Sequence, residues 1–85
     1  MTEKEKQVRG AVISAMVLIK EHIPAYYQIL RNYEKGYKPA KDFVKKVTNE
    51  VMNGNLKSNI DIINYLTNYP STERVQYTYT KYHTI

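Results

Sequence analysis

Apolar residues recur at intervals of three and four along most of the chain, which is the period of an amphipathic helix. The first such stretch spans residues 3–22, and its apolar face comprises Val8, Val12, Ala15, Ile19 and Ile23. Thr2 and Glu5 have the spacing of a capping box at the start of this helix. Pro24 ends the helix, because proline lacks an amide hydrogen and disfavours helical geometry in the residue before it.

Further apolar residues widen this face until the first helix is apolar nearly all round: Ile13, Met16, Val17 and Leu18. Such a helix either lies at the centre of a bundle or has a second buried face. In a chain of 85 residues, a partner or a second copy would cover that second face most simply. The pattern allows both arrangements, and Ile13, Met16 and Val17 are the candidate residues of a homodimer face.

The second predicted helix covers residues 24–35. Pro24 suits the first helical position, and Gly36 suits the left-handed position just after a helix. The apolar face of this helix comprises Tyr26, Ile29, Leu30 and Tyr33.

The third and fourth helices have equally clear ends. The third opens at Pro39 and closes at Gly54, with the apolar residues Ala40, Phe43, Val44, Val47 and Val51. The fourth begins at Ser58, which forms a second capping-box spacing with Asp61, and it stops at Pro70. Its apolar face comprises Ile62, Ile63, Leu66 and Tyr69.

After Pro70 the helical spacing gives way to alternation, in which Tyr77 and Tyr79 are separated by polar residues. Alternation predicts extended structure. One strand cannot satisfy its backbone alone, so this segment pairs with another copy, adds to a partner's sheet edge or stays a flexible tail. The sequence thus predicts an all-α protein, with an antiparallel four-helix bundle over residues 2–70 and an extended or flexible tail over residues 71–85.

Composition removes several classes of function. The chain has no Cys, which excludes thiol catalysis, zinc fingers and a disulfide framework. It has only two His, His22 and His83, and it contains no glycine-rich phosphate loop and no hydrolase or metalloprotease motif. We therefore expect a protein that is not an enzyme, without catalytic residues, cofactor or metal.

The longest apolar run, residues 11–19, is interrupted by a serine. It is much shorter than the ~20 residues of a membrane-spanning helix. Acidic residues precede this run and no cleavage site follows it, which does not fit a signal peptide. The expected location is the cytoplasm.

The charge and the aromatic residues point to a binding role. Thirteen Lys and Arg against eight Asp and Glu give a net charge of +5, which favours acidic partners. Nine Tyr stand beside one Phe, and tyrosine suits partly buried surfaces and interfaces. The candidate partner-binding residues are Lys38, Lys41, Lys45, Lys46, Tyr77, Tyr79 and Tyr82. A basic strip beside tyrosines also suits phosphates and bases, although the polar face of an ordinary amphipathic helix looks the same.

The middle of the chain has a familiar arrangement of apolar residues over segments 29–39, 43–47 and 62–66, with a turn from Gly36 to Pro39. It resembles the small cytoplasmic immunity proteins that protect producers of class IIa (enterocin A-type) bacteriocins. The resemblance covers about half of the chain and rests on apolar spacing, the turn and length. It implies a four-helix bundle with a flexible C-terminal segment. It also implies protection through association with the bacteriocin's membrane receptor, the mannose phosphotransferase permease, with specificity in the C-terminal half.

Two hypotheses follow. The first is a small non-enzymatic cytoplasmic protein that binds another protein, of bacteriocin-immunity or phage/host-inhibitor type. The second is a small basic DNA- or RNA-binding regulator of viral or plasmid origin. Steep salt dependence is the required signature of the second.

Overall fold

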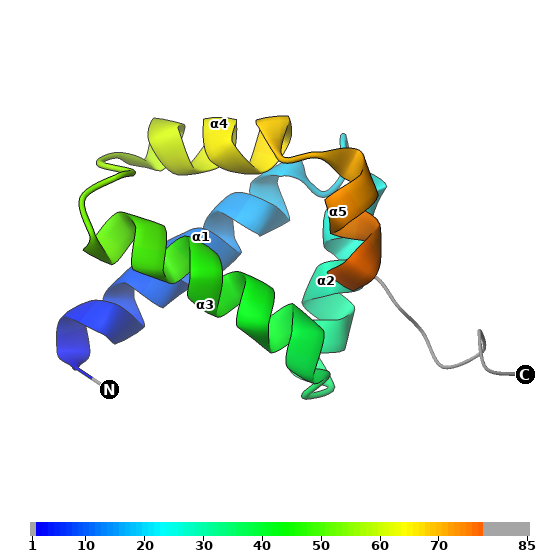
Figure 1. Cartoon of the computed structure of the whole chain (residues 1–85), viewed down its shortest axis with the longest axis horizontal. Helices are drawn as coiled ribbons and strands as arrows, with labels where there is room; N and C mark the ends of the chain where they lie inside the picture. Colours follow the sequence, from blue (N-terminus) through cyan, green and yellow to red (C-terminus); the bar gives the residue numbers. More distant parts are fainter. Residues whose placement is uncertain (1, 78–85) are drawn as a thin grey trace, which may run out of the picture.

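Five α-helices follow one another in the computed structural model, which describes residues 2–77 of the chain (Figure 1). They are α1 (Glu3–Ile19), α2 (Pro24–Glu34), α3 (Lys38–Met52), α4 (Asn59–Asn68) and α5 (Ser71–Tyr77). No strand occurs among these residues. The all-α fold predicted from the sequence is confirmed, with one helix more than expected.

The helix α1 lies at the centre and packs against α2, α3 and α4. Its buried residues are Val12, Ala15, Met16 and Ile19. Of the two arrangements that the sequence allowed, the central one is present. The far side of α1 is still partly uncovered, because Val17 is 45% and Leu18 68% exposed.

Met16 corrects one expectation. The sequence grouped it with Ile13 and Val17 as a homodimer face, but Met16 is fully buried in the core. The reason is the helical period, since residues four apart share a side. Met16 therefore lies with Val12 in the core, whereas Val17 lies with Ile13 on another side of the helix.

Local signals set the helix ends. The Thr2 hydroxyl accepts a hydrogen bond from the Glu5 amide at 3.1 Å, and the Ser58 hydroxyl accepts one from the Asp61 amide at 3.2 Å. After α2 the chain turns at Gly36, whose φ of +82° lies in the left-handed region that favours glycine. The amides of Gly36 and Tyr37 donate to the backbone oxygens of Tyr33 and Asn32 in the last turn of α2, as in a Schellman motif.

The core is built around Phe43 of α3, which is fully buried. The ring of Tyr69 meets it edge-on at 5.1 Å between centroids, and the rings of Tyr77 and Tyr26 lie at 4.6 and 6.2 Å. These four rings come from α2, α3, α5 and the end of α4. They join α2 and α5, which stand together at the right of Figure 1, to α3 and to the end of α4.

The segment Ser71–Tyr77 differs from expectation, because it is helical rather than extended and packs against α2 and α3. The side-chain amide of Asn32 donates to the backbone oxygen of Tyr77 at 3.3 Å, and the Arg74 guanidinium donates to the backbone oxygen of Tyr69. These contacts make residues 71–77 part of the bundle. Residues 78–85, with Tyr79 and Tyr82, lie outside the described part of the chain.

Within residues 2–77, none of the helices combines the length and the apolarity that crossing a membrane requires.

Candidate functional site

One stripe of α1 borders two adjoining grooves. The stripe consists of Glu5, Arg9, Ile13 and Val17 and continues to Lys20, the residue just after α1. These residues share a side because they are three or four residues apart. Tyr33 of α2 lines both grooves, so they adjoin at this residue.

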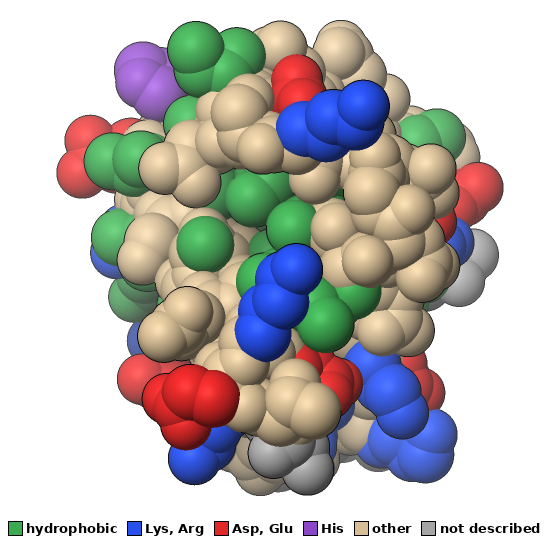
Figure 2. Space-filling model, turned by 90° about the vertical axis from the view of Figure 1, so that its left-hand side faces the viewer, with side chains coloured by type: hydrophobic (Ala, Val, Ile, Leu, Met, Phe, Trp, Pro, Cys, Tyr) green, Lys and Arg blue, Asp and Glu red, His purple; other side chains and the backbone are tan. Residues whose placement is uncertain are grey.

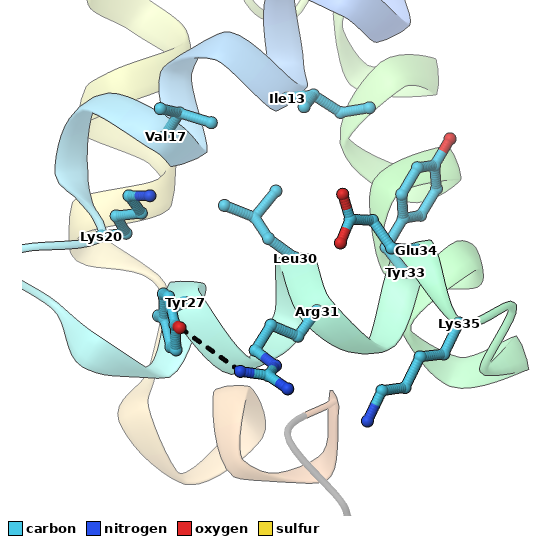
Figure 3. Close-up of a pocket in the computed structure, with 9 residues that line it drawn as sticks. All are labelled: Ile13, Val17, Lys20, Tyr27, Leu30, Arg31, Tyr33, Glu34 and Lys35. Atoms are coloured by element: carbon cyan, nitrogen blue, oxygen red, sulfur yellow. Dashed lines mark hydrogen bonds between the residues drawn. The ribbon is translucent and has the colours of Figure 1, made fainter.

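The α1–α2 groove has a volume of about 550 Å³ and is lined by Ile13, Val17, Lys20, Tyr27, Leu30, Arg31, Tyr33, Glu34 and Lys35. Leu30 points from α2 toward the gap between Ile13 and Val17 of α1 (Figure 3). Ile13 and Leu30 are half-buried and also pack against the core. The groove therefore has an apolar floor that the core holds in place.

Three cations line this groove, and two of them lie close to Tyr27. The Arg31 guanidinium donates to the Tyr27 hydroxyl at 3.4 Å and lies 5.8 Å from the ring centroid (Figure 3). The ammonium of Lys20 lies 5.6 Å from the same centroid. Both cations are within cation–π range. Tyr27 thus gathers positive charge from α1 and α2 at one end of the groove.

The α1–α3 groove has a volume of about 770 Å³ and is lined by Glu5, Arg9, Tyr33, Lys38, Lys41, Asp42, Val44, Lys45 and Thr48. Its floor differs from that of the first groove, because Val44 and Thr48 are almost completely buried. The Thr48 hydroxyl already donates to the Val44 backbone oxygen at 2.8 Å.

The cations of the α1–α3 groove are only partly neutralised. Lys38 pairs with Asp42 at 2.8 Å, an exposed pair that contributes little to stability. Arg9, Lys41 and Lys45 form no ion pair with any residue that the structure describes. They are the cations most available to an acidic ligand.

The net charge of the protein is concentrated at these grooves. Seven Lys or Arg and three Asp or Glu line them, which is a net +4 out of the +5 of the whole chain. The end of the molecule shown in Figure 2 differs, because acidic and basic side chains intermix around its hydrophobic centre. The groove face is therefore the side that attracts acidic groups.

The lysines predicted as partner-binding residues divide between two sides of α3. Lys38, Lys41 and Lys45 line the α1–α3 groove. Lys46 lies on another side, where its ammonium donates to the Tyr69 hydroxyl at 2.9 Å. This hydrogen bond raises the pKa of Lys46. The prediction that Lys46 belongs to the same strip as Lys45 was wrong, because consecutive residues of a helix point about 100° apart.

Tyr77, another predicted binding residue, is half-buried against the ring of Phe43. It serves the packing of α5, and it lines neither groove. The remaining predicted residues, Tyr79 and Tyr82, lie outside the described residues. Two tyrosines do line the grooves. Tyr27 was not singled out from the sequence, and Tyr33 was assigned only to the apolar face of the second helix.

Several groove cations were not among the predicted binding residues either: Arg9, Lys20, Arg31 and Lys35. A signal was available in α1, since Arg9, Ile13, Val17 and Lys20 mark one side of the helix with charge at both ends. The nearly continuous apolar character of α1 concealed it. The cations of α2 had no such signal, because only the packing of α2 beside α1 brings them to the groove.

The described residues contain no group of three or more His, Cys, Asp and Glu side chains arranged to hold a metal ion. His22 is exposed in the turn after α1.

Comparisons with protein-family models, with curated proteins and with solved structures find no match to this chain. The resemblance to bacteriocin immunity proteins therefore stays a prediction.

Proposed function

We propose that this chain is a non-enzymatic protein that acts by binding another protein along the two grooves beside α1. The observation that carries the proposal is the α1–α2 groove, which is lined by accessible apolar side chains together with three cations and one acid. Protein interfaces combine an apolar centre with a polar rim. Arginine and tyrosine are also enriched among the residues that contribute most to binding, and Arg31, Tyr27 and Tyr33 all line this groove.

The groove is suited to binding because it needs little reorganisation. Ile13 and Leu30 pack against the core, and Tyr27 holds Arg31 and Lys20 near its ring. Side chains that are ordered before binding lose less conformational entropy when a partner arrives. Less of the favourable interaction energy is then lost in ordering the site, so the affinity is higher.

A different protein fits this face better than a second copy of the chain. A twofold dimer buries the same patch on both subunits. Such a dimer through Ile13 and Val17 would place two groove faces of net charge +4 against each other. Like charges in contact oppose association. An acidic partner meets no such repulsion.

The resemblance to class IIa bacteriocin immunity proteins gives the proposal one concrete form, a cytoplasmic immunity protein or a phage/host inhibitor. The four-helix arrangement of α1 to α4 and the basic surface support it. Expression in a strain sensitive to class IIa bacteriocins tests the immunity form. Survival in the presence of the bacteriocin is the expected result, and unchanged killing of cells that contain the folded protein contradicts this form.

Matched substitutions on α1 test the general proposal. Val17→Asp places a carboxylate in the apolar groove, whereas Leu18→Asp makes the same change at a more exposed neighbour that lines neither groove. Affinity capture with the wild type and both variants should identify a protein that Val17→Asp loses and Leu18→Asp retains. The captured protein is then purified and its Kd measured with all three chains. Equal affinities for the two variants would show that the groove is not the binding site.

Nucleic-acid binding is the second candidate, favoured by the seven cations along the grooves. Two observations weigh against it. Three acidic side chains share the lining and repel phosphates, and the Tyr27 ring already has two cations near it rather than a free stacking surface. Gel-shift titrations at about 50 and 200 mM salt provide the test. Absence of a shifted band at the lower salt concentration removes this candidate.

A further inference from the structure

The two grooves have the same net charge but differ in how far their aliphatic side chains are exposed. The α1–α2 groove has three cations and one acid, and the α1–α3 groove has four cations and two acids, so each has a net charge of +2. Accessible apolar side chains are concentrated in the first, where Val17 is 45% exposed and Ile13 and Leu30 are half-buried. In the second, Val44 and Thr48 are buried. A ligand that lies along both grooves therefore meets accessible aliphatic side chains at one end, whereas most of the residues that line the other end are charged.

The grooves follow one line along α1. Val17 lines the first and Arg9 the second. Eight residues of helix separate them, which corresponds to about 12 Å. Because Tyr33 lines both grooves, a single segment can pass from one to the other.

The charges beyond Tyr33 favour carboxylates from a protein over a nucleic-acid backbone. Arg9, Lys41 and Lys45 are free of ion pairs among the described residues, but Glu5 and Asp42 line the same groove. A peptide can place its carboxylates beside the cations and neutral residues beside the acids. A nucleic-acid backbone carries a charge at every phosphate and cannot avoid the acids in this way.

We infer that the partner presents an acidic segment whose apolar residues lie at one end, a refinement that rests on the proposed function. The apolar end occupies the α1–α2 groove against Ile13, Val17 and Leu30. The carboxylates continue past Tyr33 to Arg9, Lys41 and Lys45. The distance of about 12 Å between Val17 and Arg9 sets the spacing of the two groups in the partner. The apolar and the acidic residues are about eight positions apart in a helical segment or about four in an extended one, in either chain direction.

Synthetic peptides of one composition but different order test this inference. Two fluorescein-labelled peptides have about 15 residues, the length of helix that spans roughly 22 Å. They carry three apolar residues at the N- or C-terminal end and glutamates interspersed with neutral residues over the remainder. A third has the same residues with the apolar ones spread evenly. A fourth is polarised but has glutamine in place of glutamate. Fluorescence anisotropy with the full chain measures each Kd.

One of the two polarised acidic peptides should bind at least about tenfold more tightly than the evenly spread and the neutral peptides. Val17→Asp should weaken its binding, and Leu18→Asp should not. Lys41→Glu should weaken the acidic peptide roughly three- to tenfold and leave the neutral peptide unchanged. Lys57→Glu is the matched control for charge, because Lys57 is exposed and lines neither groove.

Equal affinities for the polarised and the evenly spread peptide, or no binding by any peptide, overturn the inference. The proposed function still stands in that case if a captured protein distinguishes Val17→Asp from Leu18→Asp. If no protein makes that distinction, the proposed function fails as well. An oligonucleotide that binds more tightly than every peptide, and that loses affinity with Lys41→Glu, overturns both in favour of nucleic acid.

Discussion

Tyrosine has opposite roles in two regions of this protein, the aromatic core around Phe43 and the grooves beside α1. Tyr26 is fully buried, and its hydroxyl donates to the backbone oxygen of Leu66. Its neighbour Tyr27 is 44% exposed and holds Arg31 and Lys20 at a groove. Two consecutive residues of α2 thus have different roles: Tyr26 stabilises the core, and Tyr27 lies at the surface of a groove. The tyrosine-rich composition, which suggested an interface, is explained in large part by the core.

Replacing the centre of the core should have the largest effect. Phe43→Ala removes the ring that Tyr26, Tyr69 and Tyr77 contact, and it should lower the free energy of unfolding by about 3–5 kcal/mol. Urea unfolding followed by circular dichroism measures the change. Phe43→Leu, which keeps most of the volume, should cost less and leave a folded chain for comparison. A loss below about 1 kcal/mol in the alanine variant would contradict a core centred on Phe43.

Alkaline pH should destabilise the protein through Tyr26. Burial raises the pKa of Tyr26 to about 12, partly opposed by the nearby Arg74 guanidinium. Between the ordinary pKa of about 10 and this value, the unfolded chain loses the proton and the folded chain keeps it. The free energy of unfolding therefore falls by about 1.4 kcal/mol per pH unit over this window and is unaffected by Tyr26 below it.

The difference between the wild type and Tyr26→Phe isolates this contribution, because the other titrating groups are common to both. Urea titrations at several pH values from 8 to about 12 provide the measurement. A constant difference across the window would mean that Tyr26 ionises as easily in the folded chain as in the unfolded chain.

At neutral pH, Tyr26→Phe should cost about 1–2 kcal/mol. The substitution leaves the backbone oxygen of Leu66, in the last turn of α4, without the hydroxyl that donates to it. Tyr27→Phe, the matched change at the next residue, should cost under about 0.5 kcal/mol because its hydroxyl is at the surface. Chemical unfolding of the two variants side by side sharpens the comparison of the regions, and equal losses would contradict it.

A small effect on stability is also expected for Val17→Asp. Val17 is 45% exposed and lies outside the core, so the Tm should stay within a few degrees of that of the wild type. Binding of a groove partner should nevertheless be lost. A large drop in Tm would assign Val17 to the core and remove it from the candidate interface.

The helices and most of their ends were determined by the sequence itself, although α1 ends at Ile19 and not at the predicted residue 22. The caps at Thr2 and Ser58, Pro24 and the turn glycines Gly36 and Gly54 act within a few residues of chain, so their consequences can be predicted from local order. The stripe of α3 that enters the core was predicted for the same reason. Periodicity says which residues share a side of one helix.

Which side meets which neighbour was decided by tertiary structure. The short helix α5 has no strong local signal, and its contacts with α2 and α3 accompany a helical form where the alternating residues suggested an extended one. The grooves also depend on packing, since Arg31 of α2 and Lys41 of α3 lie along the same side of α1 only in the folded bundle. Residues close in sequence follow local geometry, whereas a site shared by three helices exists only after the core has placed them.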